Sequence, residues 1–90
     1  MMSPACQPQY PVEAIRANAM GRTEVRLAVD ADGRVTDREL IGASGRTPQH
    51  RLLDEAARDS ISRCRFKPAT SASGDPEAAT VDVQYEWRLD

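Results

Sequence analysis

The sequence has few aromatic residues, with one Trp, two Tyr and one Phe in 90 residues, and it lacks any long hydrophobic run. A helix that crosses a bilayer needs about 20 consecutive apolar residues, so no membrane-spanning segment is expected. The first residues also lack the apolar stretch of a secretion signal. We therefore expect either a cytosolic protein or a piece of a longer protein without its targeting segment. A chain of this length makes one domain.

An excess of positive charge is also missing. Lys and Arg number 12 against 14 Asp and Glu, which gives a net charge of -2. The basic residues are scattered among acidic ones, apart from Arg63, Arg65 and Lys67. A protein that binds a polyanion normally carries a basic patch. We therefore expect no nucleic-acid partner and a solvated surface of mixed charge.

Metal-ligating residues are scarce, because the chain has one histidine, His50, and two cysteines, Cys6 and Cys64. A structural zinc site needs four ligands, so no metal site is expected. The two cysteines either form a disulfide or remain separate buried thiols. A disulfide that closes a loop of this length would contribute about 4 kcal/mol. It would also indicate an oxidising compartment, which in a bacterium is the periplasm.

Catalytic patterns are missing as well. The stretch around Ser44 resembles part of a nucleophile elbow, but Arg46 stands where the second glycine is required. His50 is expected at the surface, in the first turn of a helix. Tyr85 and Trp87 could stack on bases or sugars, but their place in the alternation described below makes them core residues. No cofactor and no enzymatic activity are expected.

The first half of the chain predicts a helix and two strands. Residues 11–20 are good helix formers, with Val12, Ile15 and Ala19 on one face and Gly21 at the end. Residues 23–30 alternate between apolar and polar, as a half-buried strand does. A turn follows at residues 30–33. Residues 35–41 predict a second strand whose weak alternation indicates a bulge.

The second half predicts a helix and one long strand. Thr47 and Pro48 form a plausible cap and first turn for an amphipathic helix over residues 49–64. Its apolar face consists of Leu53, Ala57, Ile61 and Cys64. Residues 70–79 predict a loop. In the last strand the inward positions are Val81, Val83, Tyr85, Trp87 and Leu89, and the outward positions are Asp82, Gln84, Glu86, Arg88 and Asp90.

The predicted order is therefore α-β-β-α-β. Three strands are too few for a barrel, so their apolar face needs a cover. We predict an α+β fold, a two-layer sandwich in which a three-stranded antiparallel sheet carries two helices on one face. One long alternating strand remains at the sheet edge with unpaired backbone groups. Such an edge is either protected by its charges or accepts a peptide as an added strand.

Several segments of the chain resemble the C-terminal domain of TonB. The resemblance begins with Gln-Pro-Gln-Tyr-Pro at residues 7–11, continues with Val-Asp-x-Asp-Gly-Arg-Val at residues 29–35, and includes Leu-Asp-x-Ala-Ala at residues 53–57. Cys-Arg-Phe-x-Pro-Ala at residues 64–69 and the closing alternating strand complete it. It covers nearly the whole chain, from about Gln7 to Leu89.

The resemblance implies a periplasmic domain at the end of an inner-membrane-anchored protein. Such proteins convey the proton-motive force from an ExbB/ExbD-type motor to outer-membrane transporters for siderophores, cobalamin and similar nutrients. The contact is the TonB-box peptide at the transporter's N-terminus, which pairs with the last strand. Residues 1–9 would be an extended arm and residues 10–90 the TonB-like domain.

The resemblance also nominates peptide-binding residues and a disulfide. The binding residues lie in the arm and in the last strand: Gln7, Gln9, Tyr10, Val81, Asp82, Val83, Gln84, Tyr85, Glu86, Trp87 and Arg88. Cys64 stands where well-known members have Trp, and Cys6 precedes the Gln-Pro motif, which suits a bridge between the arm and the second helix. Arg38 stands where an apolar strand residue is common, so the second strand is expected to be irregular.

Two other functions fit the same open edge. The edge could pair with a second copy of the chain, which would make the domain a self-association module and a weak homodimer. Alternatively, a TonB-like domain could serve elsewhere in the cell envelope and bind another protein or cell-wall material.

Overall fold

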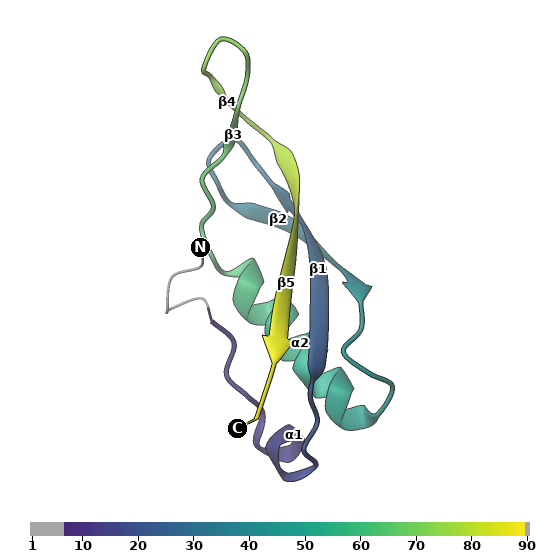
Figure 1. Ribbon diagram of the computed structural model, residues 1–90. Coiled ribbons are helices and arrows are strands. Elements are labelled where there is room, and N and C mark those ends of the chain that lie inside the picture. Colours follow the sequence, from purple (N-terminus) through teal and green to yellow (C-terminus); the bar gives the residue numbers. More distant parts are fainter. Residues whose placement is uncertain (1–6, 90) are drawn as a thin grey trace.

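The structure is a computed structural model that describes residues 7–89. Its elements, in chain order, are α1 (Val12–Arg16), β1 (Gly21–Val29), β2 (Val35–Gly42), α2 (Pro48–Ser62), β3 (Ala69–Thr70), β4 (Pro76–Glu77) and β5 (Ala79–Trp87). Figure 1 shows the long strands side by side, with α1 at one end of the molecule and the β3–β4 hairpin at the other. None of the helices in residues 7–89 is long and apolar enough to span a bilayer.

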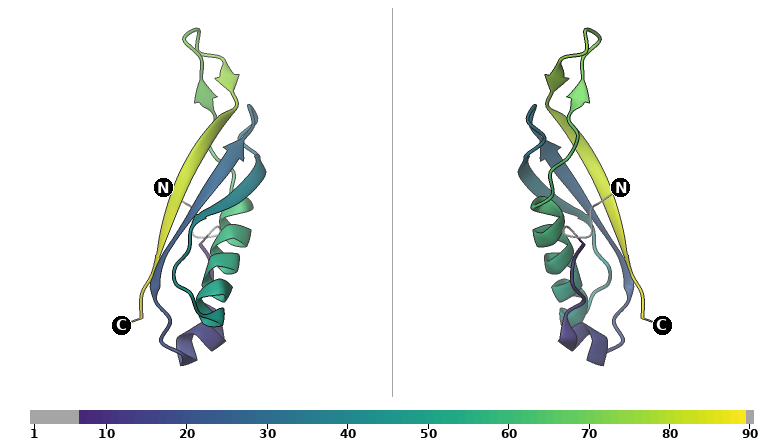
Figure 2. Two further views of the ribbon diagram at one scale, coloured as in Figure 1. Left: turned by 90° about the vertical axis from the view of Figure 1, so that its right-hand side faces the viewer. Right: turned by 90° about the vertical axis from the view of Figure 1, so that its left-hand side faces the viewer.

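The main sheet has the order β2-β1-β5, with all three strands antiparallel. In Figure 2 the sheet forms one layer, and α2 lies with the N-terminal arm and α1 in the other. The predicted fold class, an α+β two-layer sandwich with a three-stranded antiparallel sheet, is therefore confirmed. The last strand lies at a sheet edge, as predicted.

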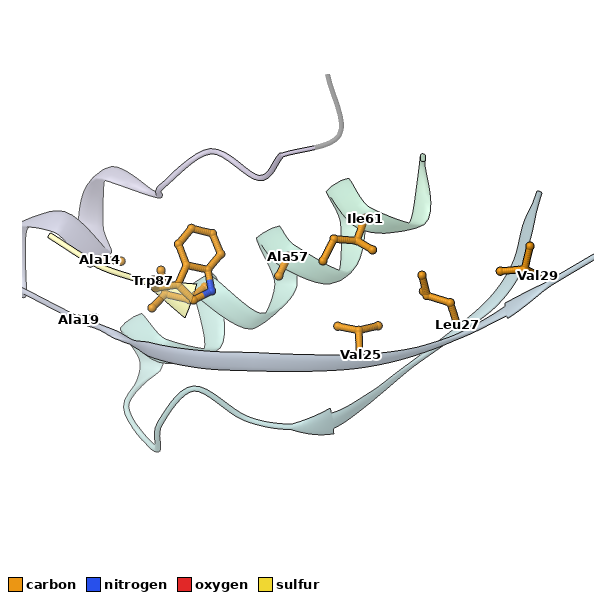
Figure 3. Packing of buried hydrophobic residues seen from close by; sticks show 9 residues of the cluster. Ala14, Ala19, Val25, Leu27, Val29, Ala57, Ile61 and Trp87 are labelled. Carbon is orange, nitrogen blue, oxygen red and sulfur yellow. The ribbon is translucent and has the colours of Figure 1, made fainter. Parts of the chain in front are cut away.

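The core lies between these layers. Its largest fully buried side chains are Trp87, Leu27, Leu53, Ile61, Val25 and Thr23. Figure 3 shows apolar side chains from β1 facing those of α2. The predicted inward face of α2 is correct, because Leu53, Ala57 and Ile61 are fully buried. Thr47 caps the helix by accepting a hydrogen bond from the backbone N–H of His50, and Pro48 occupies its first turn, as predicted.

The prediction for the first helix is wrong in length and face. The helix is only five residues long, and Val12 and Ile15 are 61% and 43% exposed while Ala14 is buried. The cause is an early C-terminal cap. Asn18 adopts a left-handed backbone with φ 53°, and the N–H of Ala19 bonds the carbonyl of Ala14 at 2.9 Å. This Schellman turn ends the helix before Gly21, the predicted stop.

Two further details concern the strands. The pairing of β2 with β1 shifts register twice, once near Val25 and once near Val29, which confirms the predicted irregularity. The pairing of β5 with β1 has no shift, from Gly21 opposite Trp87 to Val29 opposite Ala79. The predicted loop at residues 70–79 contains the short hairpin strand β4 and the start of β5. Two-residue strands are too short for alternation to reveal them.

Candidate functional site

The open edge of the sheet is formed by β5. One side of this strand pairs with β1 along its whole length, and no described strand pairs with its other side. In an antiparallel strand, successive residues direct their N–H and C=O groups alternately to the two neighbours. Every second residue of β5 therefore directs its backbone groups away from β1, toward the side where no described strand lies (Figure 1).

The two faces of β5 differ in polarity. On the helix side, Trp87 is buried and Val81, Val83 and Tyr85 are partly buried against the core. The alternation predicted for this strand is thus confirmed from Val81 to Trp87, whereas Arg88 and Leu89 follow the end of β5 and Asp90 lies outside the described residues. Because these three side chains keep part of their surface exposed beside the open edge, they form an apolar strip along it.

The other face of β5 carries polar side chains that are paired with β1. Arg26 of β1 holds Asp82 through two hydrogen bonds of 2.9 and 3.2 Å. Arg22 bonds Glu86 at 3.2 Å, and Gln84 bonds Glu24 at 3.1 Å. These cross-strand pairs hold β5 against β1 and orient its outward side chains.

Electrostatics on this face follow from the same pairs. The hydrogen bond from Arg26, with its positive charge, lowers the pKa of Asp82, and the same bond raises the pKa of Arg26. Arg88, through its hydrogen bond and charge, and then Arg22 lower the pKa of Glu86. Both carboxylates are therefore ionised at neutral pH and are already neutralised by arginines. This face of β5 therefore carries no strong net charge.

Trp87 anchors the end of β5 through rings and hydrogen bonds. Its indole makes edge contacts with Tyr85 at 4.7 Å and with Tyr10 at 5.0 Å between ring centroids. Its Nε1–H donates to the hydroxyl of Thr23 at 2.9 Å. Thr23 in turn donates to the buried carboxylate of Asp54 at 2.8 Å, which also accepts the backbone N–H of Ser44 at 3.0 Å. This buried network joins β5, β1, α2 and the loop before α2.

The N-terminal arm reaches the same end of β5. Tyr10 packs against Trp87, and its hydroxyl donates to the backbone carbonyl of Ala19. Burial, followed by the proximity of Tyr85, raises the pKa of Tyr10. Gln7 and Gln9 are exposed and Pro8 is buried. Two segments far apart in the sequence, the arm and the last strand, therefore meet at one end of the open edge.

Most residues predicted for peptide binding are thus brought together. Val81, Val83, Tyr85 and Tyr10 lie on the helix side of the edge, and Asp82, Gln84, Glu86 and Arg88 lie on the solvent side. Trp87 is 1% exposed, so it supports the edge from inside and offers no side-chain surface to a guest. Cys64 is buried after the end of α2, and Cys6 lies outside the described residues.

Sequence reasoning missed the polar network under Trp87. Thr23, Ser44 and Asp54 are far apart in the chain, so no local pattern connects them. Asp54 left one signal, since a carboxylate directly after Leu53 on the buried face of a helix must find hydrogen-bond donors.

Chemical groups for a metal site are missing from the described part of the chain, where no cluster of three His, Cys, Asp or Glu residues occurs. Beside the end of β5 lies a hollow of about 450 Å³ lined by Met20, Gly21, Arg22, Glu86, Trp87 and Arg88. Its lining contains one carboxylate, that of Glu86, which is already bonded to two arginines.

The features that distinguish the site are the outer edge of β5, with its row of backbone donors and acceptors, and the apolar strip beside it.

Fold and site together define a small two-layer α+β domain in which β5 lies at a sheet edge and has no described strand on its outer side. The chain belongs to the family described as Gram-negative bacterial TonB protein C-terminal, whose model matches residues 6–89. Its fold is similar to the solution NMR structure of the Pseudomonas aeruginosa TonB CTD, with a TM-score of 0.75 and 22% identity over 100% of this chain and 86% of that one. A search of curated proteins found no match.

Proposed function

We propose that this domain is the partner-binding end of a TonB-type energy transducer in the periplasm. It captures the TonB-box peptide of an outer-membrane transporter as an additional strand on the open edge of β5. The family to which the chain belongs supports the transducer role. The single observation that carries strand addition is the long edge of β5, which runs without a register shift and has no described strand on its outer side.

Binding is expected to be weak for a free peptide. Each backbone hydrogen bond contributes about 0.5–1.5 kcal/mol net, and ordering the peptide offsets much of that sum. In the cell the peptide is tethered to its transporter, so its effective concentration is high. An ExbB/ExbD-type motor would act through an anchor upstream of this domain, and the domain itself performs no chemistry.

The proposal is tested by mapping the backbone amide shifts of the chain on addition of a TonB-box peptide. We expect the shifts to concentrate in β5 and around Tyr10. Shifts concentrated in α2, or none at all, would contradict strand addition.

Matched peptides make the test sharper. Two versions of the peptide are methylated on the backbone nitrogens of alternate residues, one on the odd set and one on the even set. Because only one set faces β5, one version should lose binding and the other should retain it. Equal affinities of the two versions would show that backbone pairing does not hold the peptide.

The same proposal includes a disulfide between Cys6 and Cys64 that fixes the arm beside the end of α2. It suits a periplasmic location and would stabilise the domain by about 4 kcal/mol. Masses of the alkylated protein with and without reductant test it, because a bridged chain takes up label only after reduction. Label uptake by the untreated protein would contradict the bridge.

Self-association is a second candidate function, because the edge that is open to a peptide is equally open to the β5 strand of another copy. The two functions use the same backbone groups and therefore compete.

A further inference from the structure

The opposite edge of the sheet borders a groove that is separate from the peptide site. Three hollows follow one another between β2 and α2, with volumes of about 300, 390 and 220 Å³. The first two share Arg58 and the last two share Val35. We call these three neighbouring hollows together the β2–α2 groove. In the sheet, β1 lies between β2 and β5 (Figure 1), so the groove and the open edge of β5 are on opposite sides of the sheet.

Arginines dominate the lining of the β2–α2 groove. They are Arg34, Arg38, Arg51, Arg58, Arg63 and Arg65. These six make up half of the 12 Lys and Arg residues in a chain whose net charge is -2. The carboxylates in the lining are Asp37, Asp54 and Glu55. Asp54 is buried and already accepts hydrogen bonds from Thr23 and Ser44, so positive charge prevails along the groove.

The arginines of the groove differ from those of β1 and β5 in their partners. On the β5 side, Arg22, Arg26 and Arg88 each bond a carboxylate. In the groove only Arg63 does so, with Asp59 one turn earlier in α2. The other five have no ion pair within the described part of the chain. Guanidinium groups of this kind are available to carboxylates of another molecule.

The shape of the groove indicates the occupant. An extended chain fits a row of linked hollows, whereas a flat bilayer cannot follow the recess between a strand and a helix. The negative charge of Asp37 in the lining repels ligands that carry closely spaced, doubly negative groups. Its carboxylate accepts the backbone N–H of Arg38 at 2.8 Å. A ligand with single negative charges spaced along a chain, such as those of Asp and Glu side chains, can place them away from Asp37.

Backbone pairing contributes less here than at β5. The register shift near Val29 leaves Thr36 as an extra residue on β2, and such a bulge interrupts the edge and redirects its side chains. Arg38 reaches across to α2, where its Nη1 donates to the hydroxyl of Ser62 at 3.2 Å. Recognition in the groove therefore depends on side-chain charge.

We infer that the β2–α2 groove binds an acidic, extended polypeptide segment of a protein partner, independently of the peptide that pairs with β5. The domain then contacts its partners through two surfaces, one that forms backbone hydrogen bonds and one that attracts negatively charged side chains. Attraction of this kind steers the encounter and weakens as salt increases.

The test uses the full chain and a short synthetic peptide of alternating glutamate and serine. We expect amide shifts in residues 34–38 and 58–65, with β5 unaffected, and weaker binding as ionic strength rises to about 0.15 M, where the Debye length is about 8 Å. The double variant Arg38→Glu/Arg58→Glu should bind at least about tenfold more weakly. Arg46→Glu, the same type of substitution at one exposed position outside the groove and half of that charge change, should bind nearly as the parent does.

Other outcomes overturn the inference. Equal losses in the Arg46→Glu control, or shifts spread over every arginine, would show non-specific attraction. Binding to vesicles that contain phosphatidylglycerol, without binding to the peptide, would assign the groove to a membrane surface.

The variants also need a folding control. The amide spectrum of the double variant should match that of the parent outside the groove, which shows that the variant is folded and keeps this result separate from the proposed function. Should the double variant fail to fold, Arg38→Gln/Arg58→Gln replaces it, with an expected loss in the same direction.

Discussion

At the residue scale, the side chain of Thr23 joins two polar groups, the Trp87 indole and the Asp54 carboxylate, beneath the proposed peptide site. It accepts from the Trp87 indole and donates to Asp54, and all three residues are buried. No buried side-chain polar atom in the described part of the chain lacks a partner. Every polar side-chain atom of this buried network therefore has a hydrogen-bond partner, which is the condition under which buried polar groups are tolerated.

Replacing Thr23 by valine keeps the shape and removes both hydrogen bonds. The indole N–H of Trp87 then has no acceptor inside the core, and the carboxylate of Asp54 loses one of its donors. Each such group costs about 1–3 kcal/mol, so we expect the free energy of unfolding to fall by about 3 kcal/mol. Urea denaturation followed by Trp87 fluorescence measures it. Thr36→Val, the same change at an exposed position of β2, should cost less than about 0.5 kcal/mol. Equal losses in the two variants would contradict the network's importance.

At the element scale, the turn between β1 and β2 is held against the segment that follows α2. Gly33 has φ +84°, and a Cβ there would lie 2.0 Å from the backbone oxygen of Phe66. The carbonyl of Gly33 also accepts the N–H of Phe66 at 2.8 Å. Glycine is required here because of both its backbone angle and this close approach.

Gly74, at the tip of the β3–β4 hairpin, has a similar backbone angle to Gly33 but no close neighbour. It has φ +89°, but a Cβ there would meet nothing within 4 Å. We expect Gly74→Ala to cost about 1 kcal/mol for the left-handed backbone. Gly33→Ala should cost about 1–3 kcal/mol more, because the turn and the Phe66 segment must move apart. Thermal unfolding of both variants compares them directly, and equal midpoints would show that the close approach carries no energy.

Elements also differ in how far the sequence predicts them. The alternation of β5 was sufficient to place its apolar strip and its polar face, because an edge strand with one solvated face keeps period two along its length. The face of α1 was not predictable in this way. In a five-residue helix the turn at Asn18 decides which side is buried, and Ala14 faces the core in place of Val12.

The sequence likewise predicts some features of the candidate site and not others. The position of β5 at an edge follows from strand count and order, and Tyr10 was nominated by the family resemblance. The support beneath Trp87 depends on Thr23, Ser44 and Asp54, whose contact arises only in three dimensions. The β2–α2 groove was beyond prediction for the same reason, since Arg34 and Arg38 come from one edge and Arg58 from a helix. Only the sequence cluster of Arg63, Arg65 and Lys67 hinted at it.

At the scale of the whole molecule, two edges of one sheet carry different surfaces. If β5 is the site of both peptide capture and self-association, occupancy by one must exclude the other. We expect any concentration-dependent dimer, detected by sedimentation velocity, to dissociate when the TonB-box peptide is added. The glutamate–serine peptide should leave the dimer unchanged. Dimers that persist with β5 saturated would assign self-association to another surface.

The uninterrupted pairing of β5 with β1 has a mechanical consequence. A load applied parallel to these strands is divided among all the rungs between Ala79 and Trp87 at the same moment, and they must rupture together. A load applied across the strands opens the rungs one after another, like a zipper. We therefore expect the β5–β1 pairing to resist a pull along the strands more strongly than a pull across them, so that the direction of the pull decides whether the pairing holds.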